Sequence, residues 1–163
     1  MDITEIRVKI IGGRGDKLRA FCSITFDQCF VVRDLKIIEG TNGLFVACPS
    51  RKLMDRCGRC GEKNHLRAKF CNQCGKPMNP DRAGRDERGR ARLYADIAHP
   101  IHAASREGMQ KRILQAFEQE IEKSLLPGYK PVELEIDEEK FESDLSGLPQ
   151  SPADAGLGEA AGS

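Results

Sequence analysis

Tryptophan is absent from this sequence, and aromatic residues make up only 6% of its 163 positions. So few aromatic side chains can support only a small hydrophobic core. No apolar run approaches the roughly 20 residues that a membrane-spanning helix requires. The N-terminus also lacks the basic-then-apolar pattern of a signal peptide. These absences argue against a membrane protein and against a secreted one.

Cysteine, by contrast, is plentiful, with seven residues in the chain. Four of them form two Cys-x-x-Cys pairs, which are Cys57 with Cys60 and Cys71 with Cys74. Gly61 and Gly75 follow the pairs directly, where a tight turn has to reverse with a positive φ that glycine adopts freely. Four thiolates on two such turns suit a tetrahedral structural zinc site, so we predict one Zn2+ on these cysteines.

Two other interpretations of this stretch stay open. A Cys-x-x-Cys pair can also be a redox site, and His65 could replace one thiolate as a metal ligand. The run from Ala68 to Gly75 resembles the short zinc-ribbon module that is appended to many otherwise unrelated proteins. That resemblance is short, and it implies a fold but no activity.

The other three cysteines, Cys22, Cys29 and Cys48, lie in apolar stretches. A thiol in such a stretch is most often a small buried hydrophobe. With the remaining four cysteines assigned to zinc, this usage is typical of a reducing compartment, and we expect a cytoplasmic protein.

Opposite charges are separated along the chain, although the net charge is only +1. Residues 51–92 carry thirteen Lys and Arg against five Asp and Glu, whereas residues 133–163 carry one against nine. A basic patch confined to one stretch of the chain predicts a polyanionic partner, although charged residues in loops are usually only solvated.

Apolar residues recur at strand spacing over the first half of the chain. The pattern predicts strands over residues 3–11, 18–26, 29–38, 44–48 and 93–98. Asp27-Gln28 is a hairpin turn without the usual glycine, and Pro49 ends the fourth strand because it cannot donate to a ladder.

From residue 103 the apolar period becomes helical. One stripe is formed by Met109, Ile113, Ala116, Phe117, Ile121 and Leu125. Gly108 predicts a frayed start, and Pro127-Gly128 ends the helix. Residues 132–136 alternate and could add an edge strand, whereas the composition from residue 143 onward predicts disorder.

Together these elements predict an α+β protein, with a small antiparallel β-sheet and a C-terminal α-helix in a discontinuous domain of residues 1–52 and 93–130. An inserted zinc ribbon occupies residues 53–80, and a mobile basic arm occupies residues 81–92. Residues 131–163 form an acidic, largely disordered tail. Because so small a sheet with one helix leaves a face or an edge open, we expect a homodimer.

Several segments of this scaffold follow a known pattern in order. They are Ile24–Asp27, Phe30–Val32, Asp34–Lys36, Ile38–Gly40, Asn42–Ala47, Pro49–Lys52 and Asp96–Ile101. In these segments the chain resembles the stage V sporulation protein G family. The resemblance implies a small α+β dimer that binds nucleic acid with sequence preference. The family is named for a role in sporulation, but it also occurs in bacteria that make no spores.

The sequence departs from the family pattern in three places. The insert replaces a short polar turn, Cys48 stands where Met is usual, and His102 stands where an Asn would cap the helix. An insertion at a hairpin tip adds little loop-closure entropy, whereas loss of an Asn cap costs about 1 kcal/mol. The insertion also rebuilds the family's basic hairpin end.

We therefore expect a regulatory protein that binds DNA or RNA through the basic hairpin and the zinc ribbon. The expected contacts are Arg51, Lys52, Arg56, Arg59, Lys69, Arg85, Arg88, Arg90 and Arg92, and the same surface extends over Lys63, Arg67, Lys76 and Arg82. Only two aromatic residues, Phe70 and Tyr94, lie among these cations, so binding to single strands by base stacking is the weaker interpretation. The alternative is a zinc-ribbon adaptor that binds proteins without direct nucleic-acid contact.

An enzyme is the interpretation with least support. Asp96 and His99 could form an acid–base pair, and Cys22 or Cys29 could be a nucleophile. The sequence shows no further group of residues that would complete a catalytic site around them. We expect no catalytic residue, no small-molecule substrate and no cofactor besides structural zinc.

Overall fold

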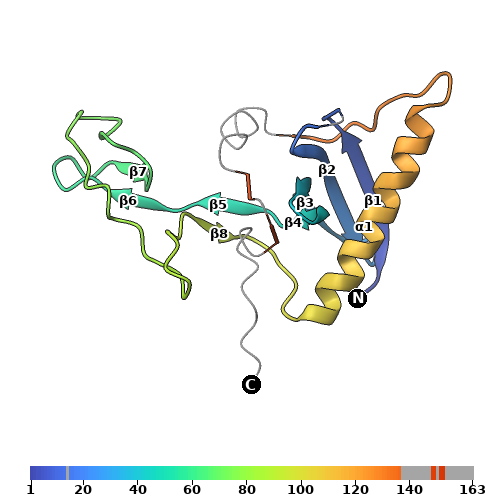
Figure 1. Cartoon of the computed structure of the whole chain (residues 1–163), viewed down its shortest axis with the longest axis horizontal. Coiled ribbons are helices and arrows are strands. Elements are labelled where there is room, and N and C mark those ends of the chain that lie inside the picture. Colours follow the sequence, from blue (N-terminus) through green and yellow to red (C-terminus); the bar gives the residue numbers. More distant parts are fainter. Residues whose placement is uncertain (14, 137–147, 150, 153–163) are drawn as a thin grey trace. The chain divides into compact units, whose positions relative to one another are not determined.

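The computed structural model describes residues 1–13, 15–136, 148–149 and 151–152. The chain divides into two compact units (Figure 1). The first, here the sheet unit, comprises Met1–Pro49 and Ala98–Ser163. The second, the inserted unit, comprises Ser50–Ile97.

The sheet unit is built on a four-stranded antiparallel sheet with the strand order β1-β2-β3-β4. The strands are β1 (Ile3–Ile10), β2 (Leu18–Phe26), β3 (Phe30–Gly40) and β4 (Gly43–Ala47). Helix α1 (Ala103–Ser124) packs against β1 and β4. The predicted α+β fold, an antiparallel sheet with a C-terminal helix, is confirmed.

A tight turn joins β2 to β3 without a glycine. Asp27 and Gln28 both have positive φ, 48° and 58°, which a non-glycine residue adopts at a cost. The N-terminal strand region supports both residues: the N–H of Asp2 donates to Asp27 Oδ1 at 2.7 Å, and the N–H of Gln28 donates to Thr4 Oγ1 at 3.0 Å. Cys29 lies in this turn and is exposed, so its predicted burial was wrong.

Alternate residues of the strands point to opposite faces of the sheet, and each face has its own apolar cluster. The helix-side cluster consists of Val8, Ala20, Cys22, Ile24, Leu35, Ile37, Val46, Ile113 and Phe117. The second-face cluster consists of Leu18, Phe21, Ile38, Phe45, Ala47 and Leu148. Two C-terminal residues, Leu134 and Ile136, pack against this second cluster.

Helix α1 buries most of the predicted apolar stripe. Ile113 and Phe117 are buried in the helix-side cluster, whereas Leu125 is the C-cap residue and is 80% exposed. Leu125 therefore does not belong to the buried stripe. No helix in the described part of the chain is long and apolar enough to cross a membrane.

The start of α1 is capped. The Nδ1 atom of His102 accepts the backbone N–H of Ser105 at 3.2 Å, which satisfies one of the donors left free at a helix N-terminus. His102 thus takes the place of the missing Asn cap. The helix is continuous from Ala103 through Gly108, and the fraying expected from Gly108 stays a prediction.

The segment after α1 does not form the edge strand predicted over residues 132–136. It contacts the sheet through the side chains of Leu134 and Ile136, on the second face, rather than through backbone pairing at an edge. The predicted disorder from residue 143 onward falls outside the described residues, apart from 148–149 and 151–152.

The inserted unit contains two small antiparallel sheets. Strand β5 (Ser50–Lys52) pairs with β8 (Tyr94–Asp96), and β6 (Met54–Arg56) pairs with β7 (Lys63–His65). Because β5 and β8 pair with each other and not with the four-stranded sheet, the inserted unit extends beyond the predicted limits of residues 53 and 92.

Candidate metal centre and cationic surface

Four cysteine side chains of the inserted unit converge on one point. The sulfur atoms all lie within 4.8 Å of one another and belong to Cys57, Cys60, Cys71 and Cys74. Cys57 Sγ lies 3.7 Å from Cys74 Sγ, and Cys60 Sγ lies 3.5 Å from Cys71 Sγ. A tetrahedral ion with metal–sulfur bonds of about 2.3 Å holds its ligands about 3.8 Å apart. The cluster therefore fits a metal ion with four thiolate ligands.

Two equivalent turns present these sulfurs. The N–H of Gly61 donates to the carbonyl oxygen of Cys57 at 2.9 Å, and the N–H of Gly75 donates to that of Cys71 at 3.0 Å. Both glycines have positive φ, 76° and 71°, as each turn requires. The repeated Cys-x-x-Cys-Gly sequence thus gives the same local backbone twice.

Asn64 connects the segments that carry the two turns through its side-chain hydrogen bonds. It is only 3% exposed, and its Nδ2 donates to Cys71 Sγ at 3.4 Å and to the Glu62 carbonyl at 3.0 Å. Its Oδ1 accepts the N–H of Asn72 at 2.7 Å. Sequence reasoning missed this residue, because an Asn in a polar loop resembles any other turn residue.

Hydrogen bonds to sulfur change the acidity of the thiols. The N–H of Cys74 is the main cause that lowers the pKa of Cys71 to about 6, and the N–H of Cys60 likewise lowers the pKa of Cys57. The N–H of Glu62 lowers the pKa of Cys60, but burial and the neighbouring thiols outweigh it and raise that pKa to about 12. Because metals bind thiolates, metal binding would release the proton that Cys60 retains.

His65 stands outside the cluster. Its Nδ1 accepts the backbone N–H of Arg67 at 3.2 Å, and the residue is exposed. The four-thiolate arrangement therefore favours the ligand set without His65.

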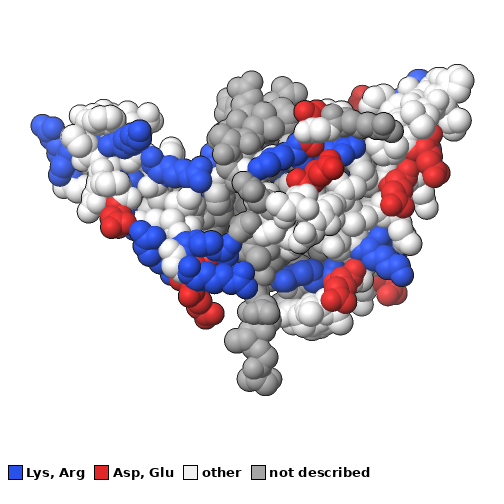
Figure 2. Space-filling model, in the orientation of Figure 1, with Lys and Arg blue, Asp and Glu red and all other residues white. Residues whose placement is uncertain are grey.

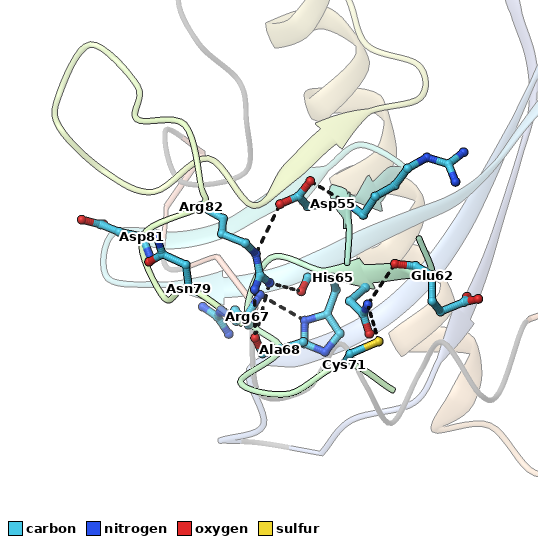
Figure 3. Close-up of polar contacts among 11 residues, drawn as sticks. Asp55, Glu62, His65, Arg67, Ala68, Cys71, Asn79, Asp81 and Arg82 are labelled. Carbon is cyan, nitrogen blue, oxygen red and sulfur yellow. Dashed lines mark hydrogen bonds and ion pairs between the residues drawn. The ribbon is translucent and has the colours of Figure 1, made fainter. Parts of the chain in front are cut away.

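Arg82 is one of the predicted surface cations, but its side chain is only 8% exposed. Its guanidinium donates to the carbonyl oxygens of His65, at 3.1 Å, and Ala68, at 3.3 and 3.4 Å (Figure 3). Nε also lies 3.5 Å from Asp55 Oδ2. Arg82 therefore holds the inserted unit together and does not extend its outer cationic surface as predicted.

Residues 85–91 form a turn closed by a short β-bridge, within the segment 81–92 that was predicted to be a mobile basic arm. Asp86 Oδ1 accepts the N–H groups of Arg88 and Arg90 at 2.9 and 2.8 Å, and Asp86 Oδ2 lies 2.9 Å from Arg90 Nε. The N–H of Arg90 is the main cause that lowers the pKa of Asp86. Arg85 pairs with Asp81 at 3.2 Å. Two of the four contacts predicted in this segment, Arg85 and Arg90, are thus already paired with acidic residues of the segment.

The other predicted nucleic-acid contacts are spread over the surface of the inserted unit, where Figure 2 shows many Lys and Arg side chains. Lys52 is half-buried, and the exposed members are Arg51, Arg56, Arg59, Lys69, Arg88 and Arg92. The unit carries thirteen Lys and Arg against six Asp and Glu, so its surface is strongly positive.

The groups considered for catalysis are not members of the four-cysteine cluster. Burial raises the pKa of the Cys22 thiol, which disfavours the thiolate that a nucleophile needs. Cys22 and Cys48 are both buried, as predicted. Asp96 and His99 belong to different compact units.

Comparison with known proteins adds a family match. A sequence model of the SpoVG family matches residues 1–119. The chain is 38% identical over 122 residues to a protein of Agathobacter rectalis, a match covering 75% of this chain and 98% of the relative. It is 39% identical over 118 residues to a protein of Clostridium kluyveri, covering 72% and 84%. A Lachnospira eligens protein is also 39% identical over 118 residues, covering 72% and 92%. All three are named as candidate septation proteins, SpoVG.

Proposed function

The chain belongs to the SpoVG family, and on that basis we propose that it is a regulatory protein that binds DNA or RNA through its inserted unit. The relatives are named for septation, and we propose that the same process is regulated here. The observation that carries the proposal is the exposed positive surface of a unit that four cysteines can clamp around an ion.

The ion that we propose is a structural Zn2+. Four thiolates fill a tetrahedral shell, which leaves no open position for a substrate or a reactive water. Zinc binding is worth about 10 to 16 kcal/mol in small zinc-finger peptides. The inserted unit has only short strands and few buried apolar residues, so an ion of this kind would supply much of its stability.

Within this surface we assign two roles to the cations. Arg88 and Arg92 lie in or beside the 85–91 turn and are exposed, so they suit contacts to phosphates, which give affinity without sequence information. Arg51 and Lys52 lie on β5, which is paired with β8. Side chains fixed by strand pairing can hold a register against base edges, so we assign sequence preference to this pair.

We also propose that the protein acts as a homodimer in the cytoplasm and carries no catalytic step. Strands β1 and β4 are the edges of the four-stranded sheet, and an edge strand presents backbone groups for pairing with another chain. Sedimentation across a wide concentration range tests the dimer, and a monomer throughout would refute it.

A salt titration with two matched double variants tests nucleic-acid binding. The Arg88→Ala/Arg92→Ala protein loses two cations that have no side-chain partner in the described part of the chain. Its slope of log K against log salt on duplex DNA should flatten by about 0.9 per lost contact. The Arg85→Ala/Arg90→Ala control loses the same charge, but its two cations are already paired with Asp81 and Asp86, so its slope should change less.

Equal flattening in the two variants would contradict the assigned contacts. No binding to duplex or single strands even at low salt would refute the proposal, and would favour the protein-interaction adaptor.

A further inference from the structure

Phe70 is an exposed aromatic residue in a unit that has only two. The other, Tyr94 on β8, is half-buried, whereas Phe70 is 61% exposed. Most of the apolar surface of Phe70 therefore stays in water, where it gains nothing from burial. A single exposed ring is ordinary on a protein surface, so the significance of this one depends on how it is held and on what surrounds it.

A short antiparallel ladder fixes the backbone of Phe70. The residue forms an isolated β-bridge with Pro77. Two backbone hydrogen bonds of 2.8 Å flank this pair, one from the N–H of Cys71 to the carbonyl oxygen of Lys76 and one from the N–H of Met78 to that of Lys69. Because Cys71 belongs to the four-cysteine cluster, the ladder is continuous with the candidate metal centre.

The ring of Phe70 points away from the cysteine cluster. Successive side chains of a strand point to opposite sides, and the next residue, Cys71, is only 3% exposed and has its sulfur in the cluster. The flanking hydrogen bonds also make Phe70 and Pro77 a non-hydrogen-bonded pair, the kind in which facing side chains lie closest. Pro77 is exposed as well. We call these two residues the Phe70 platform, a rigid apolar surface on the outer side of the ladder.

The surroundings of the Phe70 platform are positive. Lys69 and Lys76, which directly precede its two members, are both exposed. Alternation starts their side chains on the other side of the ladder, but a lysine has a flexible four-carbon stem and the ladder is only two strands wide. The whole unit carries thirteen Lys and Arg against six Asp and Glu. An apolar ring surface within a positive one suits a ligand that is both planar and anionic, and a nucleotide is both.

We propose that the Phe70 platform stacks against an unpaired base of a single-stranded nucleic acid, so that the inserted unit distinguishes single strands from duplex. This inference rests on the proposed function and names the form of nucleic acid that the unit prefers. In a duplex the flat faces of the bases are covered by their neighbours, whereas a single strand offers them to an aromatic side chain. Every base has such a face, so the platform adds affinity without reading sequence.

The small number of aromatic residues among the cations made stacking the weaker interpretation of the sequence. The way a ring is held matters as well as the number of rings. A ring on a fixed backbone has less conformational freedom to lose on binding than a ring on a mobile loop. One such ring is enough for a measurable contribution, because stacking of a single base changes affinity by about 5- to 150-fold.

Fluorescence gives the first test, because the chain contains no tryptophan. Phe70→Trp, made in the full chain supplied with Zn2+, places a sole indole on the platform. Its emission should be quenched by base stacking when a single-stranded oligothymidylate is added. Phe30→Trp is the matched control, since Phe30 lies on β3 of the sheet unit and is also 61% exposed. The control should keep its emission. An unquenched indole at position 70 in a protein that binds the strand would overturn the inference.

Affinity measurements on alanine variants give the second test. Phe70→Ala should weaken binding to single-stranded oligothymidylate by about 5- to 150-fold. Affinity for the duplex of this strand with oligodeoxyadenylate should stay the same. The slope of log K against log salt should also stay the same, because no charge is removed. Phe30→Ala should match the unaltered chain in every measurement. Amide protection of β6 and β7 shows that the inserted unit of each variant is still folded.

Two further substitutions separate stacking from a general apolar contact. Phe70→Tyr keeps a flat ring and should retain the affinity for single strands. Phe70→Leu keeps an apolar side chain without a flat ring and should lose affinity much as Phe70→Ala does. A Phe70→Leu protein that binds as tightly as the unaltered chain would overturn stacking as the mode of contact.

The outcomes separate this inference from the proposed function. Equal affinities of the two alanine variants for the single strand would overturn the inference, and binding with a steep salt dependence would leave the proposed function standing. Equal weakening on single strand and duplex would also overturn it, because an unpaired base is then not required. Failure of the unaltered chain to bind either form would refute the proposed function and the inference with it.

Discussion

Arg82 and Asp55 form an ion pair within the inserted unit, with Arg82 Nε 3.5 Å from Asp55 Oδ2. The same guanidinium donates to the carbonyl oxygens of His65 and Ala68. The Arg82 side chain thus links the Asp55 carboxylate to the backbone of residues 65 and 68. Most cations of this segment therefore contribute to its positive surface, whereas Arg82 stabilises the inserted unit from within.

Replacing Arg82 with Ala should destabilise the inserted unit by about 1.5 to 3 kcal/mol, the range for hydrogen bonds to a charged group. Arg82→Lys should also destabilise it, because the compact ammonium of Lys lacks the planar fork whose separate nitrogens reach the two carbonyls and the carboxylate. Hydrogen exchange of the β7 amides measures the effect. Arg88→Ala is the control and should change little. A Lys variant as stable as the original would show that a positive charge at this position is enough to stabilise the inserted unit.

Asn64→Ala should weaken zinc binding by about 10- to 100-fold, the usual effect of removing a partner of a metal ligand. The substitution removes the donor to Cys71 Sγ and the acceptor for the Asn72 N–H. Competition with a chelator of known affinity measures the zinc affinity of the variant and of the original protein. Asn72→Ala is the matched control, since Asn72 is exposed and makes this contact through its backbone. Equal losses in the two variants would mean that Asn64 has no particular role.

Metal removal should unfold the inserted unit and leave the sheet unit folded. All four cysteines of the cluster belong to Ser50–Ile97, and none contributes to the helix-side or second-face clusters. After chelation, amide protection should be lost in β6 and β7 and retained in β2 and β3. Loss of protection in both units together would contradict this separation.

The contact between Tyr129 and Glu120 should fail at high pH. Burial, and next the hydrogen bond to Glu120, raise the pKa of Tyr129 in the folded chain above its ordinary value of about 10. The stability from this contact is therefore present below about pH 10 and is lost as the pH rises through the higher folded value. An absorbance titration of tyrosinate should show a late step that disappears in Tyr129→Phe. A late step that survives the substitution would exclude Tyr129 as its source.

The parts of the structure that depend on local patterns could be predicted from sequence. The cysteine cluster is one, because two Cys-x-x-Cys-Gly turns each fix their own geometry. The antiparallel β2–β3 hairpin and the buried side of α1 follow from the turn, from alternation and from the helical period, whereas the strand order and the separate pairing of β5 with β8 were not predicted. The Asp27-Gln28 hairpin turn was also identified, although its support by Thr4 depends on tertiary structure.

The parts that depend on long-range contacts could not be predicted. Composition cannot tell which of thirteen cations turns inward, and Arg82 does so because Asp55 and two carbonyls meet it there. Alternation over residues 132–136 shows that one side of the segment is apolar, but it does not distinguish a paired edge strand from a segment lying on a sheet face. His102 as a helix cap required the geometry of its Nδ1 atom.

Replacing residues 53–92 with a short turn tests the central claim most directly, because it removes the cysteine cluster and most of the exposed cations. Lys52 is paired with Tyr94, so a tight turn can join the two strands. Amide protection in β2 and β3 shows whether the sheet unit remains folded. The account predicts that this protein loses most of its affinity for nucleic acid, and that the slope of log K against log salt flattens by about 0.9 for each contact removed. Unchanged affinity and slope in a folded protein would contradict it.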